Sequence, residues 1–153
     1  MNVLKIQQEL LKAMVIDPSK VKCVDRSDGW VSLALDGSLV WNIPREWLRL
    51  NLEGTQESAA VFPAEDVVIT PDNQLKATDN YRVGGTARQY LRTDDPIEQE
   101  VYVDTGKLKF FTNPTLYQHP EWPYLLYITE DLYNNGDPVW VGTVCPIKVK
   151  DED

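Results

Sequence analysis

The N-terminal stretch of the chain has apolar residues at helical spacing. Between residues 3 and 15 they recur every three or four positions, at Val3, Ile6, Leu10 and Met14, with Leu4 and Leu11 beside them. This period is typical of an amphipathic helix with one broad apolar stripe. Pro18 ends the pattern, because the residue before a proline avoids the helical region and proline has no N–H to donate. We therefore expect a helix over residues 3–15 that packs on a sheet.

The next pattern is that of short strands. Three runs rich in Val, Leu, Ile and Trp cover residues 21–25, 30–35 and 38–43. Asp36 and Gly37 between the last two predict a two-residue hairpin, since both central positions of such a turn need positive φ. This turn pairs Leu33 with Val40 and makes both faces apolar, so each face needs a cover, from the helix and from later chain or a second subunit. The two predicted faces are Val31, Leu33, Leu35 and Val40 on one side, and Trp30, Leu39, Trp41 and Ile43 on the other.

Weaker signals place the middle of the chain. Residues 44–51 predict a short helix with Pro44 in its first turn, and residues 51–74 a connection with one strand at 67–70. Alternation from Leu75 breaks at Gly84-Gly85 and leads to a strand at E-V-Y-V. The next segment, D-T-G-K-L-K-F-F, is either a three-residue hairpin or a short helix capped by Asp104 or Thr105. The spacing of Leu108 and Phe111 favours the helix.

The last third combines a loop rich in proline and aromatic residues with two strands. The loop is N-P-T-L-Y-Q-H-P-E-W-P, and a strand follows at residues 124–128. The closing strand, P-V-W-V-G-T-V-C-P-I-K-V, is continuously apolar, which indicates a central position in the sheet. In total the pattern predicts a single α+β domain over residues 1–150, with an N-terminal amphipathic helix on a mainly antiparallel twisted sheet, short additional helices, and an acidic tail at 151–153.

Composition and charge narrow the classes of function. The 153 residues, 42% hydrophobic and 25% charged, suit one globular domain. Fifteen Lys and Arg against 24 Asp and Glu give a net charge of −9, which argues against nucleic-acid binding. The polar residues within the N-terminal stretch exclude a signal peptide and a membrane span there. Cys23 and Cys145 lie far apart in apolar runs, which indicates reduced thiols and a cytoplasmic location.

Catalytic and metal-binding patterns are weak. Val103-Asp104-Thr105-Gly106 matches the core of the retroviral-type aspartic protease signature, but Lys107 follows it and a turn or helix cap explains it better. His119 is the only histidine, so a Cys–His nucleophilic pair would have to join it to Cys23 or Cys145, both of which are predicted to be core strand residues. The spacings needed for a zinc or calcium site are missing. We therefore expect no catalytic residue, metal or cofactor, and an enzyme of unknown class ranks third among the functions considered.

Two groups of residues suggest binding. Two guanidinium groups, an aromatic ring and a glycine pair could hold a phosphate or carboxylate, and Arg88 and Arg92 share a face in a strand or a helix. The competing interpretation pairs these arginines with the acidic run at residues 94–100. Aromatic residues in the proline-braced loop suit a protein interface or the cover of a sheet face. The predicted ligand site is Arg82, Gly84, Gly85, Arg88, Tyr90 and Arg92, and the predicted partner site is Tyr117, His119, Trp122 and Tyr124.

The order of these pieces resembles small uncharacterised proteins of phages and prophages of Gram-positive bacteria. The resemblance covers nearly the whole chain. It is based on the hairpin ending in W-N-I-P, on the segment V-D-T-G-K-L-K-F-F and on the final P-V-W-V-G-T-V-C-P-I-K. It implies a phage origin but no chemistry. The sequence as a whole favours a non-catalytic binding module that acts on a host protein or by self-association as a homo-oligomer. The second hypothesis is a binder or sponge of a small anionic ligand such as a nucleotide.

Overall fold

The computed structural model describes residues 1–26, 28–57, 67–92 and 100–149. The fold is α+β, with one N-terminal helix, a large and mainly antiparallel sheet, and short helical turns, as the sequence predicts. No helix of the described part of the chain is long and apolar enough to cross a membrane. The helices are α1 (Val3–Ile16), η1 (Pro18–Lys20), η2 (Arg45–Trp47), η5 (Pro71–Asn73) and α2 (Thr105–Leu108). The strands are β1 (Lys22–Asp25), β2 (Trp30–Asp36), β3 (Leu39–Pro44), β4 (Gln56–Glu57), β5 (Gln74–Arg82), β6 (Ala87–Arg92), β7 (Glu100–Asp104), β8 (Thr115–Gln118), β9 (Leu126–Glu130) and β10 (Val139–Val144).

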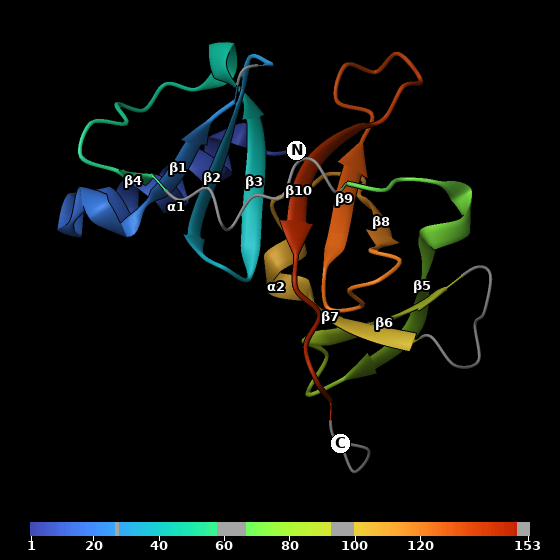
Figure 1. Cartoon of the computed structure of the whole chain (residues 1–153). Helices are drawn as coiled ribbons and strands as arrows, with labels where there is room; N and C mark the ends of the chain where they lie inside the picture. The colour runs from blue at the N-terminus through green and yellow to red at the C-terminus, as the bar shows by residue number, and fades with distance from the viewer. Residues whose placement is uncertain (27, 58–66, 93–99, 150–153) are drawn as a thin grey trace.

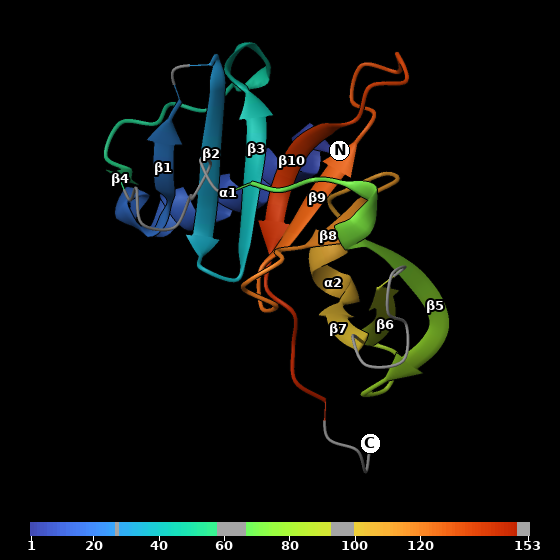
Figure 2. The same ribbon diagram turned by 45° about the vertical axis from the view of Figure 1, so that its right-hand side comes forward.

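The strands form one sheet in the order β4-β1-β2-β3-β10-β9-β8-β5-β6-β7 (Figure 1). Among the described pairings, only the short contact between β1 and β4 is parallel. The closing strand β10 lies between β3 and β9, which confirms the central position predicted from its continuous apolar sequence. It joins a flatter half of the sheet, formed by β1 to β4, to a more strongly curved half that contains β5 to β9 (Figure 2).

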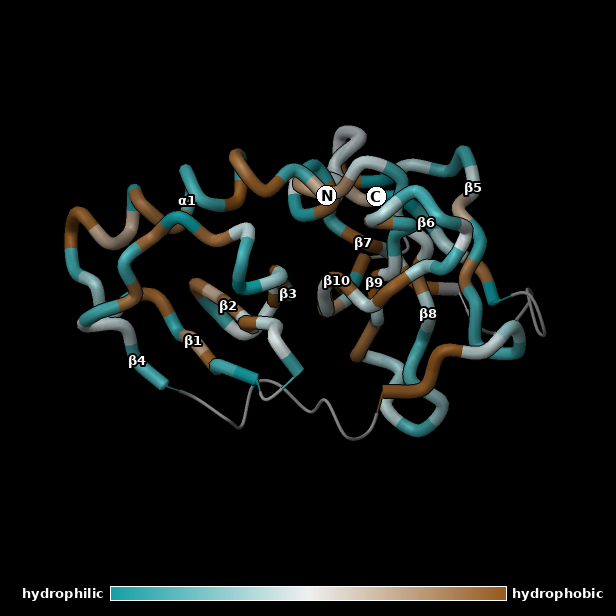
Figure 3. Tube along the Cα trace, turned by 90° about the horizontal axis from the view of Figure 1, so that it is seen from above, coloured by the Kyte–Doolittle hydropathy of each residue, from teal (hydrophilic) through white to brown (hydrophobic). Residues whose placement is uncertain are grey.

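Helix α1 lies along one side of the flatter half (Figure 3). The side chain of Asn2 caps its first turn by accepting from the N–H of Lys5 at 3.0 Å, and Asp17 with Pro18 ends it as expected. Ile6 and Leu10 are fully buried in the core cluster that also contains Val31 and Leu33 of β2. The helix therefore contacts the sheet through a narrow stripe rather than through the broad one expected from the sequence.

The β2–β3 hairpin forms, but its two turn residues are Gly37 and Ser38 instead of Asp36 and Gly37, Gly37 has no positive φ, and the predicted register is wrong by one residue. Leu33 pairs with Trp41 instead of Val40, because a bulge between Ala34 and Asp36 leaves Leu35 without a partner in the strand pairing. Asp36 stabilises the turn, since its side-chain Oδ1 accepts from the N–H of Ser38 at 2.7 Å. A shift of one residue moves every side chain of one strand to the other face.

The corrected register also changes the two faces of the hairpin. Val31, Leu33, Leu39, Trp41 and Ile43 all belong to the core cluster on the α1 side. The opposite face carries the buried pair Ser32 and Asn42, whose side chains share a hydrogen bond of 2.7 Å, and a small apolar group with Ala34, Val40 and Val24. The second face is therefore less apolar than expected, but Ser32, Ala34, Val40 and Asn42 are at most 3% exposed, so this face is covered as the sequence predicts.

The curved half turns back toward β10. Tyr102 of β7 forms an isolated antiparallel bridge with Ile147, and its carbonyl accepts from the N–H of Ile147 at 2.8 Å. Ile147 follows shortly after β10. The bridge therefore places β7, at one edge of the sheet, next to the segment that follows the central strand β10. The interior between them is filled by Leu75, Tyr90, Val103, Phe111, Leu116 and Ile128, which belong to the same core cluster as the α1 side.

Four other local predictions need correction. The expected helix over residues 44–51 is only the single turn η2, with Pro44 just before it. Residues 67–70 form no strand, and the chain enters β5 after the turn η5 instead. The proline-rich loop contains the strand β8, where Tyr117 pairs with Tyr127. The strand predicted at 124–128 is shifted to β9. The preference for a helix after β7 is confirmed, because α2 is capped by the side chain of Asp104.

Candidate binding sites

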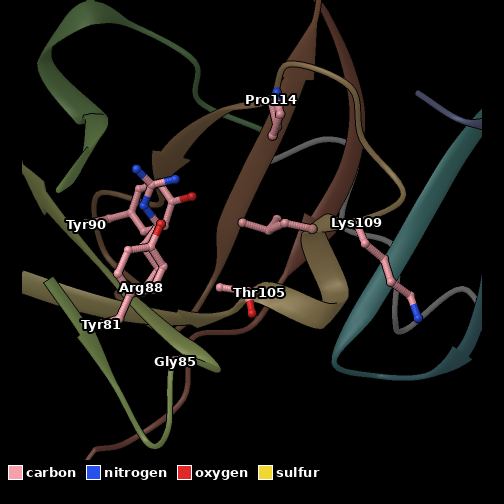
Figure 4. A pocket seen from close by; sticks show the side chains of 8 residues that line it. Tyr81, Gly85, Arg88, Tyr90, Thr105, Lys109 and Pro114 are labelled. Carbon is pink, nitrogen blue, oxygen red and sulfur yellow. The ribbon is translucent and has the colours of Figure 1, made fainter. Parts of the chain in front are cut away.

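A pocket of about 410 Å³ opens between the β5–β6 hairpin and α2 (Figure 4). Arg88 and Tyr90 reach it from β6, and Tyr81, the pairing partner of Arg88, reaches it from β5. The other side is formed by α2 and the chain after it. The lining residues are Tyr81, Gly85, Arg88, Tyr90, Thr105, Leu108, Lys109 and Pro114. Three of the six residues of the predicted ligand site, Gly85, Arg88 and Tyr90, therefore lie together.

The guanidinium group of Arg88 is held in a defined position. Its Nε donates to the carbonyl of Thr78 at 2.9 Å, and its Cζ lies 5.3 Å from the centre of the Tyr81 ring. The pairing of β5 with β6 shifts between Ala77 and Tyr81, and this irregularity places Thr78 opposite the Arg88 side chain. The nearest carboxylate among the described residues is that of Asp79, which is fully exposed and 3.9 Å from Nη2. Such an exposed pair is weak.

Tyr90 supplies a phenol beside Arg88. Tyr90 belongs to the core cluster and also lines the pocket (Figure 4). Burial raises the pKa of Tyr90 above its ordinary value, and the nearby Arg88 opposes that shift only in part. At neutral pH the hydroxyl is therefore protonated and able to donate to an anion.

The two glycines form part of the turn of the β5–β6 hairpin. Val83, Gly84 and Gly85 all have positive φ, which explains why glycine occupies two of these positions. The N–H of Gly85 donates to the carbonyl of Arg82 at 3.2 Å, and that of Thr86 donates to the carbonyl of Val83 at 3.3 Å. The N–H of Gly85 is therefore used inside the turn, although Gly85 also lines the pocket.

The other two arginines of the predicted site do not line the pocket. Arg82 pairs with Ala87 and lies near the ring of Tyr102, with 5.9 Å from Cζ to the ring centre, on the opposite face of the hairpin from Arg88. Arg92 shares the face of Arg88 but lies at the far end of β6, opposite Leu75. The competing interpretation, pairing with the acidic run, concerns Asp94, Asp95 and Glu98, which lie outside the described residues, and Glu100 at the start of β7.

The predicted partner site is divided by the structure. His119 is buried, and its Nδ1 accepts from the N–H groups of Glu121 and Trp122, both at 3.0 Å. The Trp122 ring stacks on His119 with 4.6 Å between ring centres. His119 therefore organises the loop, and Tyr117 lies within β8. Trp122 and Tyr124, 38% and 61% exposed, are the two members that present aromatic surface to solvent.

The outer face of α1 is a candidate that the sequence analysis missed. Leu4, Leu11 and Val15 are 67%, 50% and 78% exposed, and they lie seven and four residues apart on the side opposite Ile6 and Leu10. Leu4 and Leu11 were assigned to the buried stripe because they are adjacent in sequence to core residues. Leu4, Gln8 and Leu11 are four and three residues apart, which is the spacing of a second stripe along a helix, and this spacing can be read from the sequence.

The residues considered for catalysis have structural surroundings. Asp104 Oδ1 accepts from the N–H of Gly106 at 2.8 Å as the cap of α2. Cys23 lies on β1, and Cys145 directly follows β10, where its Sγ is 3.5 Å from the carbonyl of Gly37. Within the described ranges no group of three or more His, Cys, Asp or Glu side chains is arranged to hold a metal ion.

Both thiols are expected to react slowly with alkylating reagents. Burial is the largest cause that raises the pKa of Cys23 and of Cys145, so less of each thiol is ionised at neutral pH. The rate of modification by iodoacetamide should therefore rise at a higher pH in the native protein than in the protein unfolded in urea. Equal pH profiles in the two states would contradict this prediction.

No protein-family model, curated protein or solved structure matches this chain.

Proposed function

We propose that the protein is a non-catalytic binding module that associates with a second copy of itself through the outer face of α1. The observation that carries the proposal is the exposed stripe of Leu4, Leu11 and Val15, continued by Ile16, which is 73% exposed. Exposed aliphatic side chains are common singly, whereas a row of them along one helix is typical of a protein interface. The two-sided apolar hairpin expected from the sequence no longer contributes to this proposal.

The spacing of the stripe suits a symmetric pair of helices. Leu4, Gln8, Leu11 and Val15 follow one another at intervals of four, three and four residues, which reads the same in both directions. Two copies of α1 in antiparallel contact would therefore place Leu4 against Val15 of the second copy, and Gln8 against Leu11. A two-fold axis requires such a self-complementary surface. A different partner protein would gain nothing from this symmetry.

The proposed dimer is weak. A helix of 14 residues is about 21 Å long, and a pair of this length buries less than the roughly 1,200 Å² of standard complexes. We expect a dissociation constant on the order of 10 μM. Lys5 and Lys12 flank the stripe, and each copy carries a net charge of −9. Like charges oppose association, so higher salt should strengthen the dimer.

Sedimentation equilibrium of the purified chain and its Leu11→Glu variant tests the proposal. The wild-type mass should rise from monomer to dimer with concentration, and Leu11→Glu, which places a charge in the stripe, should weaken dimerisation by at least about tenfold. Leu11 is half exposed in the monomer, so the variant should keep its fold and melting temperature.

Tyr124→Ser provides the matched control, because it removes an exposed apolar side chain from the aromatic loop instead. It should dimerise like the wild type. The proposal is wrong if the wild type is monomeric at every concentration. It is also wrong if Tyr124→Ser alone abolishes the dimer, because the interface would then lie in the aromatic loop instead of on α1. The phage origin and the cytoplasmic location expected from the sequence stay predictions.

A further inference from the structure

The pocket beside Arg88 combines one fixed positive charge with the rings of Tyr81 and Tyr90 and the aliphatic side chains of Leu108 and Pro114. Within the described residues, the partners of the guanidinium group are the Thr78 carbonyl at Nε, the Tyr81 ring and, in a weak pair with Nη2 at 3.9 Å, the fully exposed carboxylate of Asp79. The two Nη nitrogens are therefore available to the oxygens of a ligand. A guanidinium fork of this kind binds a carboxylate through two parallel hydrogen bonds.

Among the described residues, Arg88 is the one cationic group in a position to contact a ligand in the pocket. Lys109 borders it, but its Nζ lies 5.2 Å from the centre of the Phe110 ring, and its side chain points away from Arg88 and Tyr90 (Figure 4). Arg82 is on the other face of the hairpin. A nucleoside triphosphate carries several negative charges, which one guanidinium in an acidic protein does not balance.

The remaining lining favours a flat apolar body on the ligand. Leu108 and Pro114 line the pocket together with the rings of Tyr81 and Tyr90, and its volume of about 410 Å³ lies in the range of roughly 300–1,000 Å³ seen for small-molecule sites. The Tyr90 hydroxyl adds a donor next to Arg88. We infer that this pocket binds a small aromatic or similarly flat carboxylate, with the carboxylate on Arg88 and Tyr90 and the apolar part between Tyr81 and Leu108.

The inference goes beyond the proposed dimer and argues against the nucleotide considered from the sequence. It depends on β5, β6 and α2, whereas the dimer depends on α1. The Leu11→Glu variant should therefore bind the same ligand as the wild type, so that the two proposals fail separately.

Benzoate is a suitable probe, and ¹H–¹⁵N correlation spectra of the protein report both affinity and location. We expect saturable shifts of the amides of Tyr81, Gly85 and Thr105 with a dissociation constant on the order of 1 mM. Benzyl alcohol, which has nearly the same shape without the charge, should bind at least about tenfold more weakly. Inorganic phosphate and ATP should also bind more weakly than benzoate.

Substitutions assign the contacts. Arg88→Gln should weaken benzoate binding by about tenfold or more, Arg88→Lys by less because the charge remains, and Tyr90→Phe by about threefold. Arg45→Gln is the matched control, because Arg45 is an exposed arginine paired with Asp25 elsewhere on the sheet. The spectrum of each variant shows whether its fold is intact. The inference is overturned if benzoate causes no saturable shifts, if ATP or benzyl alcohol binds as tightly, or if folded Arg88→Gln binds like the wild type.

Discussion

Gly142→Ala is expected to destabilise the protein by about 3 kcal/mol, the upper end of the cost of overpacking a core. A Cβ atom at this position would lie 2.7 Å from the carbonyl oxygen of Val40 and 3.0 Å from Cζ of Phe111. The first of these atoms belongs to the backbone of β3, so it moves only if the pairing of β3 with β10 moves. This pairing joins the two halves of the sheet, and Gly142 pairs with Trp41 on one side and Ile128 on the other.

The measurement is urea unfolding followed by tryptophan fluorescence, with Gly37→Ala as the control. A Cβ atom on Gly37 would have no heavy atom within 4 Å outside its chain neighbours, and Gly37 has no positive φ. Its replacement should therefore change the free energy of unfolding by less than about 0.5 kcal/mol. Equal unfolding midpoints for Gly142→Ala and the wild type would show that the strands are less closely packed than described.

Glu130→Ala is expected to cost a similar amount, about 3 kcal/mol, because it leaves the buried amino group of Met1 without its ion-pair partner and two N–H groups without their acceptor. Glu130 ends β9 and is only 4% exposed. One carboxylate oxygen accepts from the N–H groups of Thr112 and Asn113, at 2.5 and 2.8 Å, and the other forms an ion pair with the amino group of Met1. The side chain therefore fixes the chain between α2 and β8, a described segment that belongs to no strand.

Two further variants separate the causes of this loss. Glu130→Gln retains an oxygen acceptor but not the charge, so its free energy of unfolding should lie between those of Glu130→Ala and the wild type. Glu53→Ala removes an exposed carboxylate and should be nearly neutral. Chemical denaturation checks all three variants, and a neutral Glu130→Ala would contradict the assigned role of this carboxylate.

The elements that the sequence predicted well have a pattern set by neighbouring residues. α1 has a helical period and ends at a proline, and β10 has the continuously apolar sequence of a strand flanked on both sides, here by β3 and β9. The short helix α2 was favoured for the same kind of reason, since Asp104 caps it locally. In each case the signal lies within a few residues of the element.

The predictions that failed depended on contacts distant in sequence or on one local irregularity. The bulge at Leu35 accompanies a tight turn in which the side chain of Asp36 accepts from the N–H of Ser38, and it reversed the faces of the hairpin. β8 pairs with β9 and β5, which its own proline-flanked sequence does not reveal. At the ligand site, Gly85, Arg88 and Tyr90 belong to one short segment whose residue types suggest anion binding, whereas nothing in the sequence places α2 on the other wall of the pocket.

The two edge strands of the sheet, β4 and β7, affect how copies of this protein can associate. An open margin of a β-sheet offers unpaired N–H and C=O groups, to which another chain can add and start a fibre. Here β4 contributes two exposed polar residues, Gln56 and Glu57, and β7 has Ile147 beside it at Tyr102. Both margins are thereby protected against strand addition, which leaves side-by-side contact of helices as the safer route to assembly.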